Sequence, residues 1–432
     1  MNYWDSVESI SRKELEKLQL RRLKKTVELS TKNSSFYHER IPNELRNIKS
    51  LKDLEKLPTM NKDDIRKDQE QRPFLGNMLC VPEDDVVYIS TSSGSTGMPT
   101  ASPFTKEDFD SWIDYEARQF YSSGLRKSDR YCHALNMSLF VGGPCVLGAQ
   151  KIGALSIHAG TLPSERLIKI IDHFKPNFIW TTPSYAWYLG ETAAKMGFDP
   201  ANSSIKNIFV AGEPGGSIEN TRKRIENIWD AKLFDYYGLS DIFGSCAGEC
   251  VEQSGLHIAE DHMIVEVLDE DGSHVAEGEM GEMTLTTINK MARPLIRFRT
   301  GDIVNYELDK CACGRTSMRL MGIHGRLDDM VIIKGVNVMP SAIEAILRSN
   351  SDLTGEYRMI VDREDHMDTV IVETEHVKDF VGNLSSLEER IKNDIRAALG
   401  VSTKVVVYDE DTLPRATHKA KRLIDNRSNV WE

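Results

Sequence analysis

Residues 177–197 read NFIWTTPSYAWYLGETAAKMG, a short apolar run followed by a longer amphipathic one. The first part has the length of a buried strand, and the second repeats apolar residues at helical spacing. The same alternation recurs on both sides of this stretch. Strand-like segments occupy residues 131–136, 155–160, 207–214 and 231–238, and helix-like segments occupy residues 164–174 and 219–229. Strands that alternate with helices predict right-handed βαβ units on a largely parallel sheet.

The loops after these strands are the expected place for a ligand, because ligands of parallel sheets gather beyond the carboxyl ends of the strands. Three such loops have distinctive sequences: TTPSY at residues 181–185, AGEPGG at 211–216 and YYGLSD at 236–241. Their shared position at one edge of the sheet predicts a common binding site.

A change of pattern further along the chain indicates a second kind of sheet. Residues 263–269, 282–288 and 295–304 read as strands without helices between them. A smaller unit then begins, with a strand pair, a helix and a further strand. We therefore predict an α/β fold with a large multi-sheet body over residues 1–327 and a small, mobile α+β lid over residues 328–432.

Composition and charge indicate a soluble globular protein of two or three domains. The chain has 432 residues and a net charge of −12, which argues against a general nucleic-acid or anionic-membrane surface. Its apolar runs fall short of the roughly 18 residues that span a bilayer. The N-terminus lacks the apolar core of a signal peptide, so we expect a cytoplasmic protein.

A leucine-rich helix is expected over residues 14–31, with Arg21, Arg22, Lys24 and Lys25 between the leucines. A basic amphipathic helix of this kind could contact a membrane or dock on the protein core. Acidic residues on the same segment favour the docked helix, and no membrane partner is predicted.

The stretch STSSGSTGMPT at residues 90–100 combines many hydroxyl groups with little side-chain bulk. Glycines let backbone N–H groups converge on an anion, and serine and threonine hydroxyls add donors, as in a phosphate-binding loop. It is not a Walker A loop, because it lacks the lysine of that motif. Taken by itself, the stretch is equally compatible with a solvated turn.

Seven cysteines in a chain without secretory features are better interpreted as thiols or metal ligands than as a disulfide framework. Three of them lie among apolar residues and are expected in the core: Cys80, Cys132 and Cys145. Another four residues supply three thiolates and one imidazole, which is the ligand set of a closed structural zinc site: Cys250, His257, Cys311 and Cys313. Cys246 could replace Cys250, and His262 could replace His257. The alternative is two unrelated pairs of reduced cysteines.

Six motifs follow one another along the chain. They are SSGSTGMPT at residues 92–100, GEP at 212–214, YYGLSD at 236–241, FRTGD at 298–302, GRLDDMVIIKG at 325–335 and LPRATHKAKR at 413–422. Together they resemble the core motifs of the adenylate-forming acyl-CoA synthetase superfamily. Three further segments resemble the phenylacetate–CoA ligase branch of that superfamily in particular. They are GLHIAEDH at residues 255–262, CACGRT at 311–316 and GVNVMPSAIE at 335–344. The resemblance covers the chain from Cys80 to the C-terminus.

The resemblance implies ATP-dependent activation of a carboxylic acid, phenylacetate or a related aryl acid, to an acyl-adenylate. Transfer to coenzyme A would then give acyl-CoA, with AMP and pyrophosphate as the other products. ATP, Mg²⁺, coenzyme A and structural Zn²⁺ are the implied cofactors, and a homodimer is suggested. Two alternatives remain: an adenylating enzyme that passes the acyl group to an amine, cofactor or carrier protein, and a non-catalytic nucleotide- or zinc-binding module.

The resemblance also implies a nucleotide site. Its hydroxyl-rich loop would wrap the β- and γ-phosphates with Ser92, Ser93, Gly94, Ser95, Thr96 and Gly97. The GEP motif would flank adenine, and the aromatic residue of the YG motif, Tyr237, would stack on it. The residues that the resemblance places around the nucleotide here are Gly212, Glu213, Pro214, Asp235, Tyr236, Tyr237, Gly238 and Ser240. Asp302 corresponds to the clamp on the ribose hydroxyls, a role that suits a carboxylate facing a vicinal diol. Arg326 corresponds to an arginine near the ribose and phosphates.

The lid motif supplies the catalytic lysine that this family uses to bridge the substrate carboxylate and the α-phosphate. Lys419 matches that lysine. Lys421, two residues further along the chain, is the residue most easily mistaken for it. Asp328 matches the hinge residue between body and lid. Gly335 matches the glycine at which the pantetheine arm of coenzyme A passes close to the backbone. The residues expected to line the acyl pocket are Phe140, Tyr185 and Ala211.

Two positions of the site depart from the family pattern. The chain has Asp241 where the family usually has a glutamate that helps hold Mg²⁺. A shorter carboxylate can still bind a hard cation, directly or through water, so we expect Asp241 to keep this role with altered geometry. Met98 stands where the family often has lysine, so the phosphate loop loses one charge.

Overall fold

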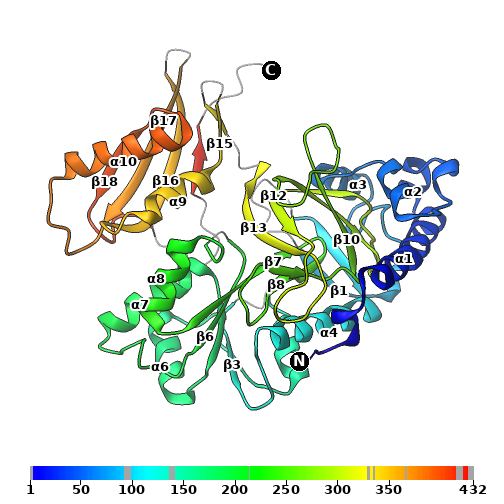
Figure 1. The fold of residues 1–432 in the computed structure, drawn as a ribbon, viewed down its shortest axis with the longest axis horizontal. Helices are drawn as coiled ribbons and strands as arrows, with labels where there is room; N and C mark the ends of the chain where they lie inside the picture. The colour runs from blue at the N-terminus through cyan, green and yellow to red at the C-terminus, as the bar shows by residue number, and fades with distance from the viewer. Residues whose placement is uncertain are drawn as a thin grey trace.

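In the part of the chain that the structure describes, eleven strands form one sheet at the centre of the molecule (Figure 1). The computed structural model describes residues 3–91, 99–135, 142–213, 215–327, 331–333, 336–364, 367–414 and 422–426. Several residues discussed above lie outside the described residues: Ser92, Ser93, Gly94, Ser95, Thr96, Gly97, Met98, Phe140, Pro214, Asp328, Gly335, Lys419 and Lys421. The roles expected of them stay predictions.

The central sheet has the strand order β10-β11-β12-β13-β9-β8-β7-β6-β5-β3-β4. The bounds are β3 Arg130–His133, β4 Leu155–His158, β5 Phe178–Thr181, β6 Asn207–Val210, β7 Lys232–Leu239, β8 Phe243–Glu249, β9 Leu256–Ile258, β10 Met263–Leu268, β11 Gly281–Thr287, β12 Phe298–Glu307 and β13 Arg319–Arg326. Strands β3 to β7 pair in parallel, and the pairs beyond β7 are antiparallel. The prediction of a parallel region built from βαβ units, followed by strands without helices between them, is confirmed.

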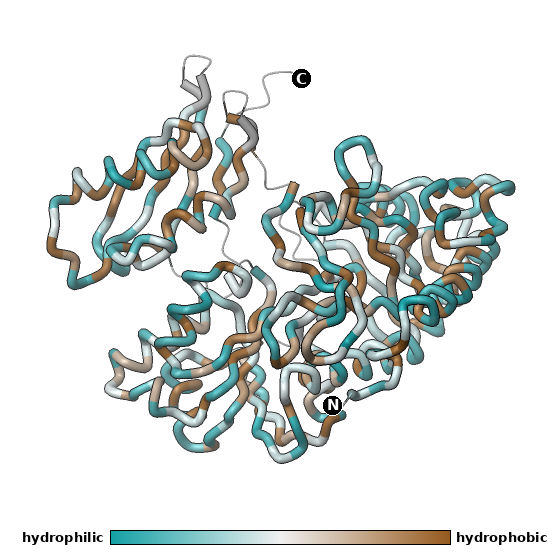
Figure 2. Tube along the Cα trace, viewed as in Figure 1, coloured by the Kyte–Doolittle hydropathy of each residue, from teal (hydrophilic) through white to brown (hydrophobic). Residues whose placement is uncertain are grey.

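The helices that connect the parallel strands include α6 Ser164–Phe174, α7 Pro183–Lys195 and α8 Glu219–Trp229. Helix α7 begins where Thr182 accepts a hydrogen bond from the Tyr185 backbone and Pro183 fills the first turn. These helices and one set of strand side chains form a buried cluster that includes Leu189. Alternate strand residues, such as Tyr131, join a larger core with α4 Lys106–Ser122 and α5 Val146–Ile152. Figure 2 shows the hydrophobic residues along the strands.

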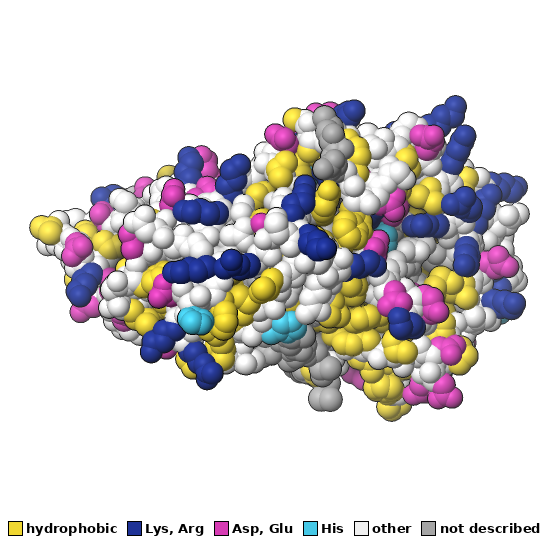
Figure 3. All heavy atoms as spheres, turned by 90° about the horizontal axis from the view of Figure 1, so that it is seen from below, with side chains coloured by type: hydrophobic (Ala, Val, Ile, Leu, Met, Phe, Trp, Pro, Cys, Tyr) yellow, Lys and Arg dark blue, Asp and Glu magenta, His cyan; other side chains and the backbone are white. Residues whose placement is uncertain are grey.

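The N-terminal region adds α1 Arg12–Asn33, α2 Ser35–Arg40 and α3 Lys62–Gln71, preceded by the 3₁₀ turn η1 Ser6–Ser9. Ser11 and Glu14 form a capping box that starts α1, and Leu23 and Val27 on its inner face join the larger core. The expectation of a docked helix is therefore confirmed. No helix in the described ranges combines the length and apolarity that crossing a bilayer requires. Figure 3 shows a face where basic and acidic side chains are interspersed.

The hydroxyl-rich stretch connects two strands, β1 Val86–Thr91 and β2 Ala101–Thr105, which pair antiparallel. Thr91 and Ala101 face each other in this pair, so the two ends of the stretch are held side by side. Ser90 Oγ donates to the Ser240 carbonyl at 3.2 Å, which ties β1 to the end of β7. The loop thus begins and ends against the YYGLSD motif.

The last hundred residues build a unit with its own core. Its elements are β14 Val331–Ile333, β15 Val336–Val338, α9 Pro340–Ser349, β16 Leu353–Glu364, β17 Met367–His376, α10 Leu384–Leu399, β18 Lys404–Tyr408 and β19 Leu423–Asp425. The four-stranded sheet has the order β18-β17-β16-β19. Its buried cluster draws on residues 331–423 alone. The expected strand pair, helix and further strand are confirmed.

This C-terminal unit, the lid, contacts the body at α7 and α8 (Figure 1). The contact centres on the Trp187 indole, which lies 3.9 Å from the Arg224 guanidinium of the body and 5.4 Å from that of Arg348 in the lid. Arg224 Nη1 also donates to the Leu353 carbonyl of the lid at 3.1 Å. Gly355 has a φ of +84°, and a Cβ there would lie 2.9 Å from the indole, so only glycine fits this close approach.

Candidate active site

Tyr237, Asp302 and Arg326 converge at one point although they lie on three strands. Asp302 on β12 faces Arg326 at the end of β13, and Arg326 Nη1 donates to Asp302 Oδ1 at 2.8 Å. The Tyr237 hydroxyl, from β7, donates to Asp302 Oδ2 at 2.5 Å. The structure therefore brings together the residues that we assigned to adenine, the ribose and the phosphates.

Burial controls the electrostatics of this group. Only 2% of Asp302 and 9% of Tyr237 is exposed. Burial, followed by the negative charge of Asp302, raises the pKa of Tyr237 well above its ordinary value, so its hydroxyl remains a donor. A buried carboxylate whose orientation is fixed by two donors is suited to accept hydrogen bonds from a diol.

Tyr236 lies in the protein core, unlike its neighbour Tyr237. Successive strand residues point to opposite faces, and the Tyr236 ring packs against Trp180 with centroids 4.9 Å apart. Its hydroxyl shares a hydrogen bond with Ser123 Oγ at 2.5 Å. Both the ring and the hydroxyl that we expected at the nucleotide are therefore engaged in the body.

Two other residues of the motif also brace the body. The buried Asp235 carboxylate accepts from Ser217 in the loop after β6, and burial raises its pKa to about 6. Gly238 approaches the neighbouring strand so closely that a Cβ would lie 1.6 Å from the Gly244 carbonyl oxygen. These contacts brace the body beside the site, and the nucleotide contact expected of both residues stays a prediction.

The loop after β6 carries Ala211, Gly212 and Glu213 at the carboxyl edge of the sheet. Gly212 has a φ of +94°, a conformation that favours glycine. Glu213 Oε1 accepts from the Ser184 backbone at 2.7 Å, and burial raises the pKa of Glu213. The loop is thereby fixed to the first turn of α7.

Asp241 is surrounded by cations. Lys62 Nζ lies 2.5 Å from Asp241 Oδ2, and Arg293 Nη2 lies 3.3 Å from Oδ1. Thr100 Oγ1, just after the hydroxyl-rich stretch, donates to Oδ1 at 3.5 Å. Burial opposes ionisation of Asp241, but the charges of Lys62 and Arg293 outweigh it and lower its pKa. Asp241 is therefore an ionised carboxylate in a positively charged surrounding.

Tyr185 is only 8% exposed and belongs to the cluster between the sheet, α6 and α7. Its hydroxyl shares a hydrogen bond with Ser164 Oγ at 3.0 Å. This placement favours a core role for Tyr185 over the pocket-lining role that we expected. Ala211, the other described candidate, stays at the strand end where a substrate is expected.

The four predicted zinc ligands lie together although they come from three separate segments. Their ligand atoms all fall within 4.8 Å of one another in a set formed by Cys250, His257, Cys311 and Cys313. Cys250 Sγ is 3.9 Å from Cys311 Sγ, and Cys313 Sγ is 3.5 Å from His257 Nε2. The alternative ligand His262 instead contacts Ser111 and Asp261.

These separations fit a tetrahedral zinc ion. Zn–S bonds of ~2.3 Å and Zn–N bonds of ~2.1 Å at tetrahedral angles give S···S and S···N separations of ~3.8 and ~3.6 Å. His257 also hydrogen-bonds Ser317 Oγ through Nδ1 at 3.0 Å, which fixes the ring with Nε2 toward the thiols. All four residues are buried, so the set could hold a structural zinc with no open position.

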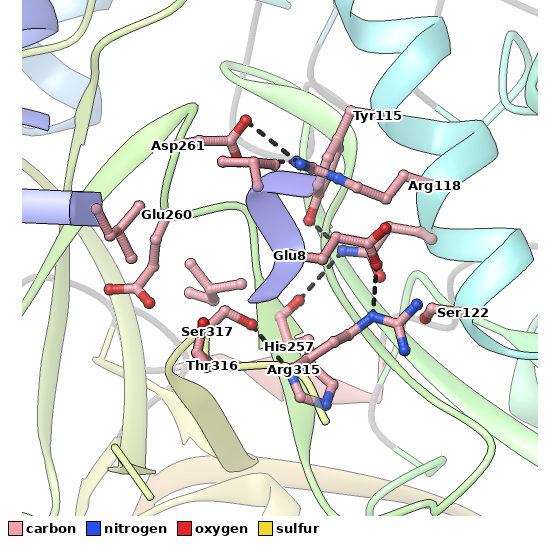
Figure 4. Close-up of a pocket in the computed structure, with 14 residues that line it drawn as sticks. Glu8, Tyr115, Arg118, Ser122, His257, Glu260, Asp261, Arg315, Thr316 and Ser317 are labelled. Atoms are coloured by element: carbon pink, nitrogen blue, oxygen red, sulfur yellow. Dashed lines mark hydrogen bonds and ion pairs between the residues drawn. The ribbon is translucent and has the colours of Figure 1, made fainter. Parts of the chain in front are cut away.

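The N-terminal turn η1 packs against the segment that carries two of these cysteines (Figure 4). Arg315 Nε donates to Glu8 Oε2 at 2.5 Å, and the Thr316 backbone donates to the Glu8 carbonyl at 3.1 Å. A cavity of about 30 Å³ beside His257 is lined by these residues and by Arg118. The cysteine segment thus holds the start of the chain on the body.

Sequence reasoning missed Lys62 and Arg293. They lie 179 and 52 positions from Asp241 along the chain, and neither falls within a recognisable motif. It also missed the lid contact of Trp187, because an aromatic residue in an amphipathic helix looks the same whether it faces a core or another domain.

Comparison with known proteins defines the class. The family model described as AMP-binding enzyme matches residues 17–293, and the model of the AMP-binding enzyme C-terminal domain matches residues 335–427. The chain belongs to the AMP-binding, adenylate-forming enzymes. Its curated relatives include the phenylacetate–coenzyme A ligases of Thermus thermophilus, 33% identical over 99% of this chain and 100% of the relative, and of Aromatoleum evansii, 35% identical over 98% and 97%. This confirms the predicted family, and with it an AMP-forming ligase that uses ATP and coenzyme A.

Solved structures of one relative superpose on nearly the whole of this chain. The structure of 2-hydroxyisobutyryl-CoA ligase with 2-HIB-AMP in the postadenylation state is 30% identical and superposes with a TM-score of 0.90, covering 97% of this chain and 91% of the other. The same ligase in the thioesterification state, with coenzyme A, gives 0.72. This chain therefore superposes more closely on the postadenylation structure than on the thioesterification structure, and the predicted fold class is confirmed.

Proposed function

We propose that this ligase activates phenylacetate or a closely related aryl acid. ATP binding is supported by one observation: Tyr237, Asp302 and Arg326 lie together beside the carboxyl edge of the parallel sheet. The curated relatives, whose names specify phenylacetate, support the choice of acid. Ala211, the described residue that we expect to line the acyl pocket, has a small side chain at the end of β6.

The first half-reaction follows from the chemistry of these groups. The substrate carboxylate oxygen attacks the α-phosphorus of ATP, and the bond to the β-phosphate oxygen breaks, releasing pyrophosphate. Asp302 would hold the ribose hydroxyls, and Tyr237 would support the adenine ring. Arg326 would lie near the α-phosphate, where negative charge grows in the transition state.

The second half-reaction requires a different lid position. The thiolate of coenzyme A attacks the acyl carbon, and AMP leaves with the bonding electrons. The lid would first deliver Lys419 for adenylation and then turn about Asp328, so that Gly335 admits the pantetheine arm. The closer superposition on the postadenylation structure supports the first of these two positions.

The cysteine–histidine set would hold one structural zinc ion in this enzyme. Four protein ligands leave no position for a substrate, so the ion would fix the cysteine segment to β8 and β9 and supply no chemistry. The measured separations of the ligand atoms support this assignment.

Replacing Asp302 by asparagine is expected to weaken ATP binding roughly 10- to 100-fold. Hydrogen bonds to charged groups contribute about 1.5–3 kcal/mol each, and every 1.4 kcal/mol is tenfold in affinity. The measurement is the KM for ATP in pyrophosphate release. Tyr237→Phe is the matched control, since it removes the other partner of this hydrogen bond but keeps the ring, and its effect should be at most a few-fold. Equal effects of the two variants on the KM for ATP would contradict the proposal that Asp302 holds the ribose hydroxyls.

A panel of acids tests the proposed substrate. Pyrophosphate release and acyl-CoA formation would be measured with phenylacetate, its ring-hydroxylated derivatives, benzoate, 2-hydroxyisobutyrate and acetate, each with and without coenzyme A. We expect the highest kcat/KM for phenylacetate or another arylacetate. A preference for the small aliphatic acids would refute the aryl substrate while leaving the ligase class intact.

A further inference from the structure

Asp241 stands at the position expected to bind magnesium, yet its carboxylate is already balanced by protein cations. Lys62 contacts one carboxylate oxygen and Arg293 contacts the other. A divalent ion bound directly at either oxygen would lie next to a lysine ammonium or a guanidinium. Because like charges in a buried site repel strongly, the surroundings of Asp241 do not fit a direct magnesium ligand.

Two cations share the Asp241 carboxylate. Lys62 and Arg293 supply two cations, and Asp241 supplies one anion. Lys290 lies next to them and donates to Ser102 Oγ at 2.6 Å, but burial holds its pKa well below the ordinary value. The nearby carboxylates Asp68 and Asp108 accept hydrogen bonds from backbone N–H groups. Arg293 is compensated by Asp241 and by the electrostatic attraction of Asp68, whereas Asp241 is the carboxylate that contacts Lys62.

Only one cation of this cluster can be reached from outside. The Arg293 side chain is 0% exposed, whereas 26% of the Lys62 side chain is exposed. Lys62 is the first residue of α3, and Gln69 of the same helix exchanges two hydrogen bonds with the Ala101 backbone, at 2.7 and 3.0 Å. Thr100, one residue earlier, contacts Asp241 itself. Lys62 is thus held beside the end of the hydroxyl-rich stretch.

We propose that Lys62 binds the β- and γ-phosphates of ATP, and that Asp241 is a positioning residue that orients Lys62 instead of a direct magnesium ligand. The proposal rests on the proposed function, since it needs ATP in this site. It also accounts for Met98, because a lysine from α3 would supply the charge that the phosphate stretch itself lacks. Magnesium would then travel with the nucleotide without a bond to Asp241.

Equilibrium binding to the full chain separates this role from a structural one. Calorimetry would compare ATP, inorganic pyrophosphate and AMP on the wild type, Lys62→Met, Lys62→Arg and the control Lys67→Met, an exposed lysine of the same helix. We expect Lys62→Met to weaken ATP and pyrophosphate roughly 10- to 100-fold while AMP is unchanged. Lys62→Arg should recover most of the loss, and Lys67→Met should match the wild type.

The outcomes distinguish this proposal from the proposed function. A wild type that binds neither ATP nor AMP would refute the nucleotide site as a whole. A wild type that binds both, with Lys62→Met losing AMP as much as ATP or losing neither, would overturn the role of Lys62 alone.

A double-mutant cycle tests Asp241. If Asp241 acts through Lys62, Asp241→Asn added to Lys62→Met should weaken ATP binding no further, and the magnesium concentration for half-maximal activity should not change in Asp241→Asn. Additive losses, or a rise of tenfold or more in that magnesium concentration, would make Asp241 a metal ligand after all. If Asp241→Asn does not fold, Asp241→Glu takes its place, because it keeps the charge but moves the carboxylate.

Discussion

Replacing Lys419 by alanine is expected to lower acyl-adenylate formation by about a thousandfold and to leave thioester formation from supplied acyl-adenylate within a few-fold of the wild type. Removing one preorganised donor from a developing charge typically lowers kcat by ~10²–10³, and a lysine contributes a full charge as well. The second half-reaction releases AMP and involves no attack on phosphorus. Pyrophosphate release from acid and ATP measures the first step, and acyl-CoA formation from synthetic acyl-adenylate measures the second.

Lys421→Ala is the matched control, since it removes the same charge two residues away. It should leave both half-reactions near the wild type. If Lys421→Ala and not Lys419→Ala blocked adenylation, the lysine would be misassigned. If Lys419→Ala slowed both half-reactions equally, the separate use of the lid in the two steps would be wrong.

The described residues on either side of this segment are fixed to the lid. The Arg422 carbonyl accepts from the Met359 backbone at 2.7 Å, and the Arg422 guanidinium pairs with Glu356 at 3.3 Å. On the other side, the Leu413 backbone donates to Glu375 on β17. The segment that contains Lys419 therefore begins and ends on the lid sheet, so rotation of the lid would move this lysine with it.

Much of the fold could be predicted from sequence because its signals are local. The apolar run of β5 and the amphipathic pattern of α7 are complete within twenty residues, and each element is stabilised by contacts on one face. The order of the antiparallel strands could not be predicted, since β9 pairs with β13 across more than sixty residues. Pairing of that kind depends on loops that carry no register information.

The site was predictable only where a motif marked it. Tyr237, Asp302 and Arg326 were located through their motifs, and the structure brings them together. For Tyr236 and Tyr237, the alternation of strand residues says that they face opposite sides, but the fold decides which side holds the core. Lys62 could not have been found, because an isolated lysine at a helix start is most often solvated.

The aromatic stretch around α7 shows why residue type alone misleads. Tyr185 and Trp187 both join the cluster beneath the helix, but only Trp187 also contacts Arg348 of the lid, beside Arg224 of the body. Both are aromatic residues of one amphipathic stretch, and only Tyr185 was expected to line the acyl pocket. What separates them is their direction from the helix axis, since two positions along a helix turn the side chain by about 200°.

Removing the zinc site is expected to destabilise the body more than any single core substitution. Cys313→Ser should lose stoichiometric zinc and lower the Tm by roughly 10 °C or more, because structural zinc contributes its binding free energy directly to folding. The larger core of the body, which excludes these residues, should keep the protein from unfolding completely at 25 °C. Elemental analysis of protein purified without chelator and thermal unfolding measure the two effects.

Cys246→Ser is the matched control for this experiment. Cys246 is equally buried, but its sulfur contacts the Phe243 carbonyl at 3.6 Å and it lies outside the ligand set. The Cys246→Ser variant should retain zinc. Its Tm should fall less than that of Cys313→Ser, because only the core packing around Cys246 changes. Because Arg315 and Thr316 hold η1 through Glu8, metal loss should also make the N-terminal turn more sensitive to protease in Cys313→Ser than in Cys246→Ser. Wild-type protein without zinc, or zinc lost from Cys246→Ser and kept by Cys313→Ser, would contradict the assignment.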